Sequence, residues 1–147
     1  MKSLPNLSVR RAVPRDSEQL CQLADELILL PIGSDRETML KALLQDHDRV
    51  VYVADANGLL VGFIELRIFP DFVEGAPIAV IQNLIVREAY RRLGIGTGLM
   101  EKASEEAKKR SAKEIHVWTE SSNEKAIHFY TKHGFERKAL LFEKILG

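Results

Sequence analysis

The spacing of apolar and polar positions divides the chain into strands and helices. Alternating or continuous apolar runs predict strands, and apolar positions three or four residues apart predict helices. We expect strands at residues 7–13, 50–54, 59–69, 78–86 and 114–119, with one or two more within residues 135–145. Helices are expected at residues 16–30, from residue 34 to about 45, from the glycine-rich segment described below to about residue 110, and at residues 124–132.

This element order, β-α-α-β-β-β-α-β-α-β, predicts a single α/β domain over residues 1–147, with a mixed central sheet of six to seven strands flanked by about four helices. The strand at residues 78–86 is apolar on both faces except for Gln82 and Asn83, which places it centrally in the sheet. Asp16 followed by Gln19 has the pattern of a capping box at the start of the first helix.

Composition bears on the binding partners, the cellular compartment and the metal content that we expect. Lysine plus arginine equals aspartate plus glutamate, at 21 each, so net charge gives no reason to expect nucleic acid or a membrane surface as a partner. The single cysteine, Cys21, excludes an internal disulfide and favours a reducing compartment. Residues 1–11 lack the apolar core of a signal peptide, so we expect a cytoplasmic protein. No histidines or acids have metal-ligand spacing, and we expect no metal.

A glycine-rich segment joins the central strand to the helix that follows it. Residues 90–100 read Tyr-Arg-Arg-Leu-Gly-Ile-Gly-Thr-Gly-Leu-Met. Glycine lets a backbone approach a ligand closely, and the first amides of a helix have no partner within the helix and carry partial positive charge. Arg91 and Arg92 add full charges. The segment therefore predicts a phosphate-binding loop.

Three phosphate-binding patterns compete for this segment. A P-loop needs Lys followed by Ser or Thr after its last glycine, whereas apolar residues follow Gly98 here. A dinucleotide fingerprint has Gly-x-Gly-x-x-Gly in a first βαβ unit, whereas this Gly-x-Gly-x-Gly follows about 90 other residues. The third pattern is Arg/Gln-x-x-Gly-x-Gly/Ala, which Arg91, Gly94 and Gly96 match. A tight strand-to-helix turn with solvated arginines is the alternative without a ligand.

A second pattern lies 32 residues beyond Arg91. It consists of Asn123, Ala126, Phe129, Tyr130, Gly134 and Phe135. The loop resembles the acetyl-CoA pyrophosphate loop of the GCN5-related N-acetyltransferase (GNAT) superfamily, and the second pattern resembles the C-terminal motif of that family. The expected element order is also similar to the family's fold along essentially the whole chain.

The resemblance implies where acetyl-CoA, the co-substrate, binds. The backbone at the end of the central strand, Leu84, Ile85 and Val86, would pair with the pantetheine arm, and an amide of Ile85 or Val86 would polarise the thioester carbonyl. The backbone of residues 92–97 would surround the pyrophosphate. The loop residues assigned to the cofactor are Arg91, Arg92, Leu93, Gly94, Ile95, Gly96 and Thr97. Asn123 would contact the pantetheine region, and Tyr130 would lie near the sulfur.

The chemistry of the transfer defines the side chains that are needed. An amine attacks a thioester directly, but an alkyl ammonium with a pKa of about 10 must first lose its proton. The leaving thiolate, whose thiol has a pKa of about 8.5, benefits from a proton donor. Because the resemblance places Tyr130 near the sulfur, it implies that Tyr130 is this general acid; the alternative is that its ring only packs its helix against the sheet.

The general base stays open. Some family members carry a glutamate on the central strand where this sequence has Val80, and the neighbouring Gln82 and Asn83 cannot act as bases. Glu65 and Glu120 are the leading candidates, and a solvent-mediated route is an equal alternative. Further candidates are Asp71, Glu74, His116 and His128.

The leading hypothesis is acetyl-CoA-dependent acetylation of a primary amine, most simply on a small molecule. The alternatives are the same chemistry on a protein or peptide amine, and a non-catalytic CoA-binding sensor or subunit, which the absence of a carboxylate at Val80 favours. Exposed sheet edges make a homodimer possible. The sequence does not define the acceptor, nor whether other acyl-CoAs are used.

Overall fold

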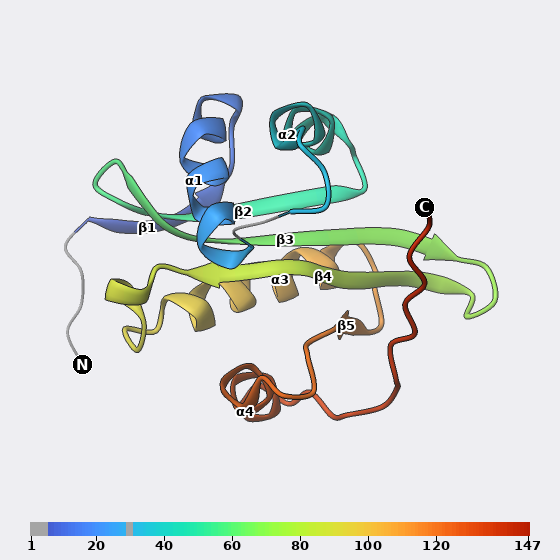
Figure 1. Cartoon of the computed structure of the whole chain (residues 1–147). Coiled ribbons are helices and arrows are strands. Elements are labelled where there is room, and N and C mark those ends of the chain that lie inside the picture. Colours follow the sequence, from blue (N-terminus) through green and yellow to red (C-terminus); the bar gives the residue numbers. More distant parts are fainter. Residues whose placement is uncertain (1–5, 29–30) are drawn as a thin grey trace. The chain divides into compact units, whose positions relative to one another are not determined.

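A computed structural model describes residues 6–28 and 31–147 of the chain (Figure 1). The chain forms two compact units, one ending at His116 and the other running from Val117 to Gly147. We describe each unit by itself. Among the described residues, no helix combines the length and the apolar character needed to cross a membrane.

The first unit is built on a sheet in which the strands follow their sequence order. Strands β1 (Leu7–Arg11), β2 (Arg49–Ala56), β3 (Leu59–Asp71) and β4 (Ala76–Val86) pair antiparallel, each with the next. The sheet ends at the short strand β5 (Ile115–Val117), which spans the boundary between the units. Helix α3 connects β4 to β5, and such a crossover is what a parallel pair in a mixed sheet requires.

Helices cover both faces of this sheet. Helices α1 (Ser17–Leu27) and α2 (Arg36–Gln45) lie on one face, and α3 (Ile95–Lys109) lies on the other (Figure 1). Leu20 and Leu23 of α1 pack in one apolar cluster with Val53, Phe63 and Ile85 from three neighbouring strands. On α3 the buried side chains recur at helical spacing and are Ile95, Leu99, Met100, Ala103 and Ala107. The apolar periodicity of the sequence therefore predicted these helices correctly.

The sheet has five strands, so the expectation of six to seven was wrong. The missing strands are those expected within residues 135–145, a stretch that has no regular structure. Its large apolar side chains, Leu140, Leu141, Phe142 and Ile145, are between 63% and 87% exposed. A strand needs a neighbour that takes up its backbone hydrogen bonds, and β propensity alone does not supply one.

Smaller differences concern element ends. Asp16 stands at the start of α1, but its carboxylate accepts hydrogen bonds from Arg10 and from the Val13 amide rather than from the helix, so the expected capping box is absent. The Gln19 side chain instead bonds the backbone of Gly58 and Leu60. Short 3-10 helices occupy Pro14–Asp16 and Glu88–Tyr90. Helix α1 ends at Leu27, and the expected extension through residues 29–30 lies outside the described residues.

The second unit contains helix α4 (Glu124–Lys132) and the segment that follows it. Gly134 has a φ of 89°, the left-handed conformation in which many helices end. The Phe135 amide donates to the Tyr130 carbonyl (3.0 Å) and the Gly134 amide to the Thr131 carbonyl (3.1 Å), which is the Schellman arrangement. The sequence predicted this helix and its glycine stop.

Candidate active site

The glycine-rich segment forms the turn from β4 into α3, as predicted. Gly94 immediately precedes the helix with a φ of 82°, and Arg92 is also left-handed with a φ of 64°. Glycine adopts this conformation without strain, whereas Arg92 does so at a cost, and strained residues of this kind gather at ligand sites.

The start of α3 is open in a way that suits an anion. Gly94, which precedes the helix, supplies no side-chain cap, and the first turn contains no acidic residue. The first helical hydrogen bond in α3 runs from the Gly98 amide to the Gly94 carbonyl (3.0 Å). Within the described part of the chain, the amides of residues 92–96 donate no backbone hydrogen bond. Unpaired amides and the helix dipole together make this end of α3 a potential phosphate cradle.

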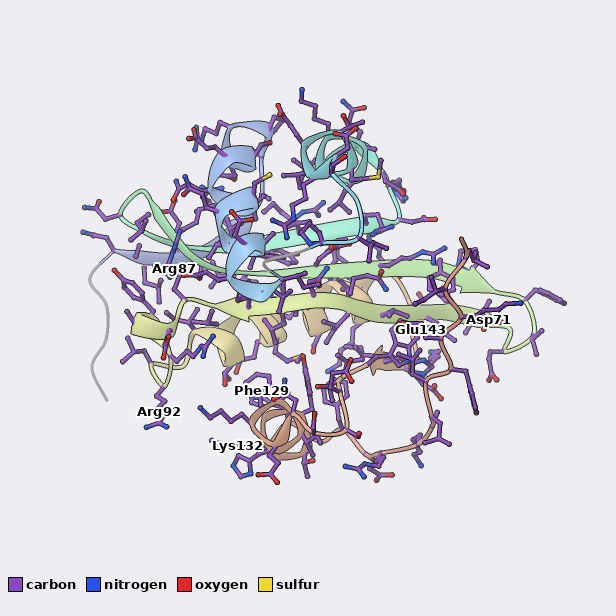
Figure 2. All side chains as sticks on the ribbon, viewed as in Figure 1. Asp71, Arg87, Arg92, Phe129, Lys132 and Glu143 are labelled. Atoms are coloured by element: carbon purple, nitrogen blue, oxygen red, sulfur yellow. The ribbon has the colours of Figure 1, made fainter. Side chains whose placement is uncertain are left out.

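The arginines of the segment have different settings. The Arg91 Nε donates to the Val86 carbonyl (3.0 Å), which ties the loop to the last residue of β4. Arg92 is exposed and extends from the loop away from the ribbon (Figure 2). Arg87, just after β4, donates from Nε to the Leu60 carbonyl (2.9 Å) and lies 3.5 Å from Glu26. Arg91 and Arg92 thus place positive charge at the loop, while Arg87 joins β3 to α1.

Among the strands of the described residues, none is paired with the second edge of β4 at residues 84–86. Gly62, Phe63 and Ile64 of β3 pair with Val86, Ile85 and Leu84 on the other side. Strand β5 has only three residues and begins beside the first half of β4, where the Ala79 amide donates to the Glu114 carbonyl (3.1 Å). The backbone of residues 84–86 therefore retains hydrogen-bonding capacity along its second edge, next to the open start of α3.

A buried polar cluster lies on the sheet face that carries α1 and α2. Glu65 of β3 is only 8% exposed, and its two oxygens accept from Arg49 Nη2 (2.5 Å) and from Asn83 Nδ2 (3.0 Å). Arg49 Nε is buried and has no hydrogen-bond partner within the described residues. The sequence marked Glu65 as a candidate base and Asn83 as an exception on an apolar strand, but nothing local connected them to Arg49.

Tyr130 lies within an aromatic cluster of the second unit. Its ring centroid is 5.4 Å from that of Phe129 and 5.5 Å from that of Phe135, both edge-on. Phe129, labelled in Figure 2, also stacks on His133 at 4.3 Å. The ring contact between Tyr130 and Phe135 is the apolar contact that accompanies a Schellman motif. Burial raises the pKa of the Tyr130 hydroxyl above its ordinary value, so the group stays protonated at neutral pH.

Asn123 and Glu120 precede α4. The Asn123 Oδ1 accepts from the Ala126 amide (3.1 Å) and so caps the helix, which leaves its Nδ2 available for a ligand. Glu120 is exposed, and its carboxylate has no partner within the part of the chain that the structure describes. The loop residues and the end of β4 therefore belong to the first unit, whereas Glu120, Asn123 and Tyr130 belong to the second. Within the described residues, no three histidine, cysteine or acidic side chains are grouped to hold a metal ion.

The open start of α3 beside the free strand edge has the features of a site for a phosphorylated, extended ligand. Residues 18–135 match the acetyltransferase (GNAT) family, and the chain belongs to that family, whose members are acyltransferases.

The chain is similar to proteins of several organisms. An uncharacterized N-acetyltransferase of Methanocaldococcus jannaschii is 34% identical over 69% of this chain and 45% of its own length. An N-alpha-acetyltransferase of Sulfurisphaera tokodaii is 36% identical over 67% of this chain and 63% of its own length. This chain thus spans less than two thirds of either relative.

Solved structures share the fold. The crystal structure of an aminoglycoside acetyltransferase from an uncultured soil metagenomic sample, in complex with trehalose, superposes with a TM-score of 0.85 at 22% identity. The superposition covers 99% of this chain and 100% of that one. The α/β architecture expected from the sequence is confirmed, apart from the number of strands.

Proposed function

We propose that this protein transfers the acetyl group of acetyl-CoA to a primary amine of a small molecule. The observation that carries the proposal is the open start of α3, with unpaired amides at residues 92–96 and no acidic residue in its first turn. Because the chain belongs to an acetyltransferase family, a diphosphate-bearing acyl donor is the ligand that this geometry suits best.

In this proposal the residues of the loop hold the acyl donor. The amides of residues 92–97 and the charges of Arg91 and Arg92 bind the pyrophosphate. The free backbone edge at Leu84, Ile85 and Val86 pairs with the pantetheine arm, and an amide of Ile85 or Val86 donates to the thioester oxygen as charge develops on it. Asn123 contacts the pantetheine region through its Nδ2.

The reaction needs no protein nucleophile. The nitrogen of the neutral amine forms a bond to the thioester carbonyl carbon, the carbon–sulfur bond breaks, and the amine proton is lost while the CoA sulfur gains one. Tyr130 is the proton donor to the sulfur, since a tyrosine hydroxyl carries its proton at neutral pH. Glu120, Glu65 and water are the candidates for removing the proton of the amine.

A peptide or protein amine is the second candidate acceptor. The similarity to an N-alpha-acetyltransferase of Sulfurisphaera tokodaii favours it, whereas the fold shared with an aminoglycoside acetyltransferase favours the small molecule. Release of CoA thiol should therefore be measured with two panels: small amines (polyamines, amino acids, aminoglycosides) and peptides with free N-termini.

We expect acetyl-CoA-dependent thiol release with a small amine, and a lower kcat/KM with every peptide. Faster transfer to peptides would assign the second acceptor class instead. Acetyl-CoA binding without transfer to any amine would leave a CoA-binding sensor or subunit as the function.

A further inference from the structure

Arg49, Glu65 and Asn83 form a polar cluster on the sheet face that also carries α1 and α2. Phe63 and Ile85 belong to the apolar cluster beneath α1 and α2, and β-strand side chains alternate between faces. Glu65 and Asn83 stand two residues along from them, directly opposite each other, and so share that face. The cluster is thus the polar interruption in an otherwise apolar surface between the sheet and α1–α2.

A β-bulge places this cluster at the end of β4. Glu65 pairs with Asn83 but the next residue, Leu66, pairs with Ile81, which leaves Gln82 as the inserted residue. Bulges bend a strand and redirect its side chains, and they are frequent beside active sites. Asn83 directly precedes the segment proposed to hold the thioester. At a rise of about 3.3 Å per residue, it lies about 7 Å along the strand from Ile85.

Glu65 fixes the orientation of the Asn83 carboxamide. An ionised carboxylate only accepts hydrogen bonds, so Asn83 has to turn its Nδ2 toward Glu65 (3.0 Å). Its Oδ1 then points away from Glu65 and accepts no hydrogen bond within the described residues. Arg49 occupies the other Glu65 oxygen (2.5 Å), which neutralises the carboxylate and holds it in place.

The unpaired donor in the cluster argues for a functional rather than a purely structural role. Arg49 Nε is buried without a partner among the described residues, and such groups are rare in native proteins because they cost stability. Replacing a buried ion pair by apolar residues is often neutral or stabilising. Stability alone therefore does not explain why this cluster interrupts the apolar face.

We propose that Asn83 binds the acceptor amine through Oδ1 and that Glu65 is a positioning residue acting through Asn83, not the general base. This inference rests on the proposed function. Each Glu65 oxygen accepts a hydrogen bond from a neighbouring side chain, Arg49 or Asn83, and this arrangement suits a residue that holds Asn83 in place. An uncharged oxygen also suits the task, because a nearby carboxylate would raise the pKa of the amine and hold it as the unreactive ammonium. One N–H donated to Asn83 leaves the nitrogen lone pair for the thioester carbon.

The test combines two single variants and their double variant in the acetyl-transfer assay. Asn83→Ala should lower kcat/KM for the amine about tenfold and leave acetyl-CoA affinity within about twofold of wild type, because it removes one hydrogen bond to the acceptor. Glu65→Gln should cause a smaller loss and preserve the shape of the pH profile. Because Glu65 acts through Asn83, adding Glu65→Gln to Asn83→Ala should cause no further loss. Gln22→Ala, an exposed amide on α1, is the matched control.

Each contrary outcome has a distinct meaning. Unchanged kcat/KM in Asn83→Ala would remove Asn83 from acceptor binding. Loss of the acidic limb of the pH profile in Glu65→Gln, with additive losses in the double variant, would make Glu65 the base. If Asn83→Ala loses acetyl-CoA binding, the contact with the amine is tested instead in the wild-type protein, through the ¹⁵N resonance of the Asn83 side chain. We expect that resonance to shift on addition of the amine, and no shift would overturn the proposal. If the wild-type protein transfers the acetyl group to no amine, the proposed function itself is rejected, and no variant is needed to show this.

Discussion

Helix α3 starts differently from α2 and α4. Helix α4 begins at Asn123, whose side chain caps the Ala126 amide (3.1 Å), and α2 begins at Asp35, which caps the Thr38 amide (3.2 Å). Both helices also have a glutamate in the first turn. Helix α3 has a left-handed glycine in place of the cap and no acid in its first turn.

The missing cap and the missing acid at the start of α3 indicate that a ligand binds there. A side-chain cap and an acidic first turn each stabilise a helix by roughly 0.5–1 kcal/mol. Helix α3 has neither, although Gly96 and Gly98 also weaken its first turns. The packing of Leu99, Met100 and Ala103 in the core holds the helix in place instead. An external anion can therefore take the position that Asn123 and Asp35 fill at the other helices.

The largest effect is expected when an acidic residue is introduced into the first turn of α3. Gly96→Asp should weaken acetyl-CoA binding at least about 100-fold, because a carboxylate then faces the pyrophosphate. The same carboxylate should keep or raise thermal stability, since it complements the helix dipole. Calorimetric titration and thermal denaturation measure the two effects.

Gly96→Asn is the matched neutral control for this change. It has the same shape without the charge, and we expect it to retain most of the affinity for acetyl-CoA. Equal affinities of the Asp and Asn variants would show that charge at the start of α3 does not matter for binding.

A second change separates binding at α3 from chemistry at α4. Tyr130→Phe should lower kcat about 10- to 100-fold and leave acetyl-CoA affinity unchanged, because only the proton donor is removed. Burial raises the pKa of Tyr130, so its contribution to stability is present below the ordinary value of about 10 and is lost as pH rises through the raised value. Tyr130→Phe should remove this alkaline loss. An unchanged kcat would reduce Tyr130 to its packing contact with Phe135.

A third change tests how the loop is attached to the strand. Arg91→Ala should weaken acetyl-CoA binding about tenfold, since it removes both a charge and the bond from Nε to the Val86 carbonyl. Arg91→Lys keeps the charge and should lose about threefold. Titration at low and high ionic strength should show a weaker salt dependence for Arg91→Ala only. Wild-type affinity in Arg91→Ala would assign the residue to the surface.

The smallest change distinguishes a cap from a ligand contact at α4. Asn123→Ala should lower the free energy of unfolding by about 1 kcal/mol, whereas Asn123→Ser should preserve it because serine is also a good cap. If the Nδ2 of Asn123 contacts the pantetheine, Asn123→Ser should still weaken acetyl-CoA binding about threefold. An affinity equal to that of the wild-type protein would mean that Asn123 serves only as a cap.

Local sequence patterns predicted what depends on local interactions. The glycine loop, the extent of α3 and the stop of α4 at Gly134 follow from periodicity and from glycine's freedom, and the structure confirms them. The family and the architecture could be predicted for the same reason, because two motifs lie in a regular order of elements.

Contacts between residues that are far apart in the sequence could not be predicted from local patterns. The Glu65–Asn83 contact depends on the β3–β4 register and on the bulge at Gln82, and the Arg49–Glu65 pair on β2–β3 packing. The prediction of strands within residues 135–145 was wrong for a related reason. Apolar residues such as Phe142 and Ile145 have the propensity for a strand, but only a neighbouring strand makes one.

In the proposed function, the open start of α3 binds acetyl-CoA. An NMR titration of ¹⁵N-labelled wild-type protein with acetyl-CoA tests it most directly, because each backbone amide reports separately. We expect saturable chemical-shift changes that are largest for the amides of residues 92–97, with further changes at residues 84–86. No shifts, or shifts confined to other parts of the chain, would contradict it.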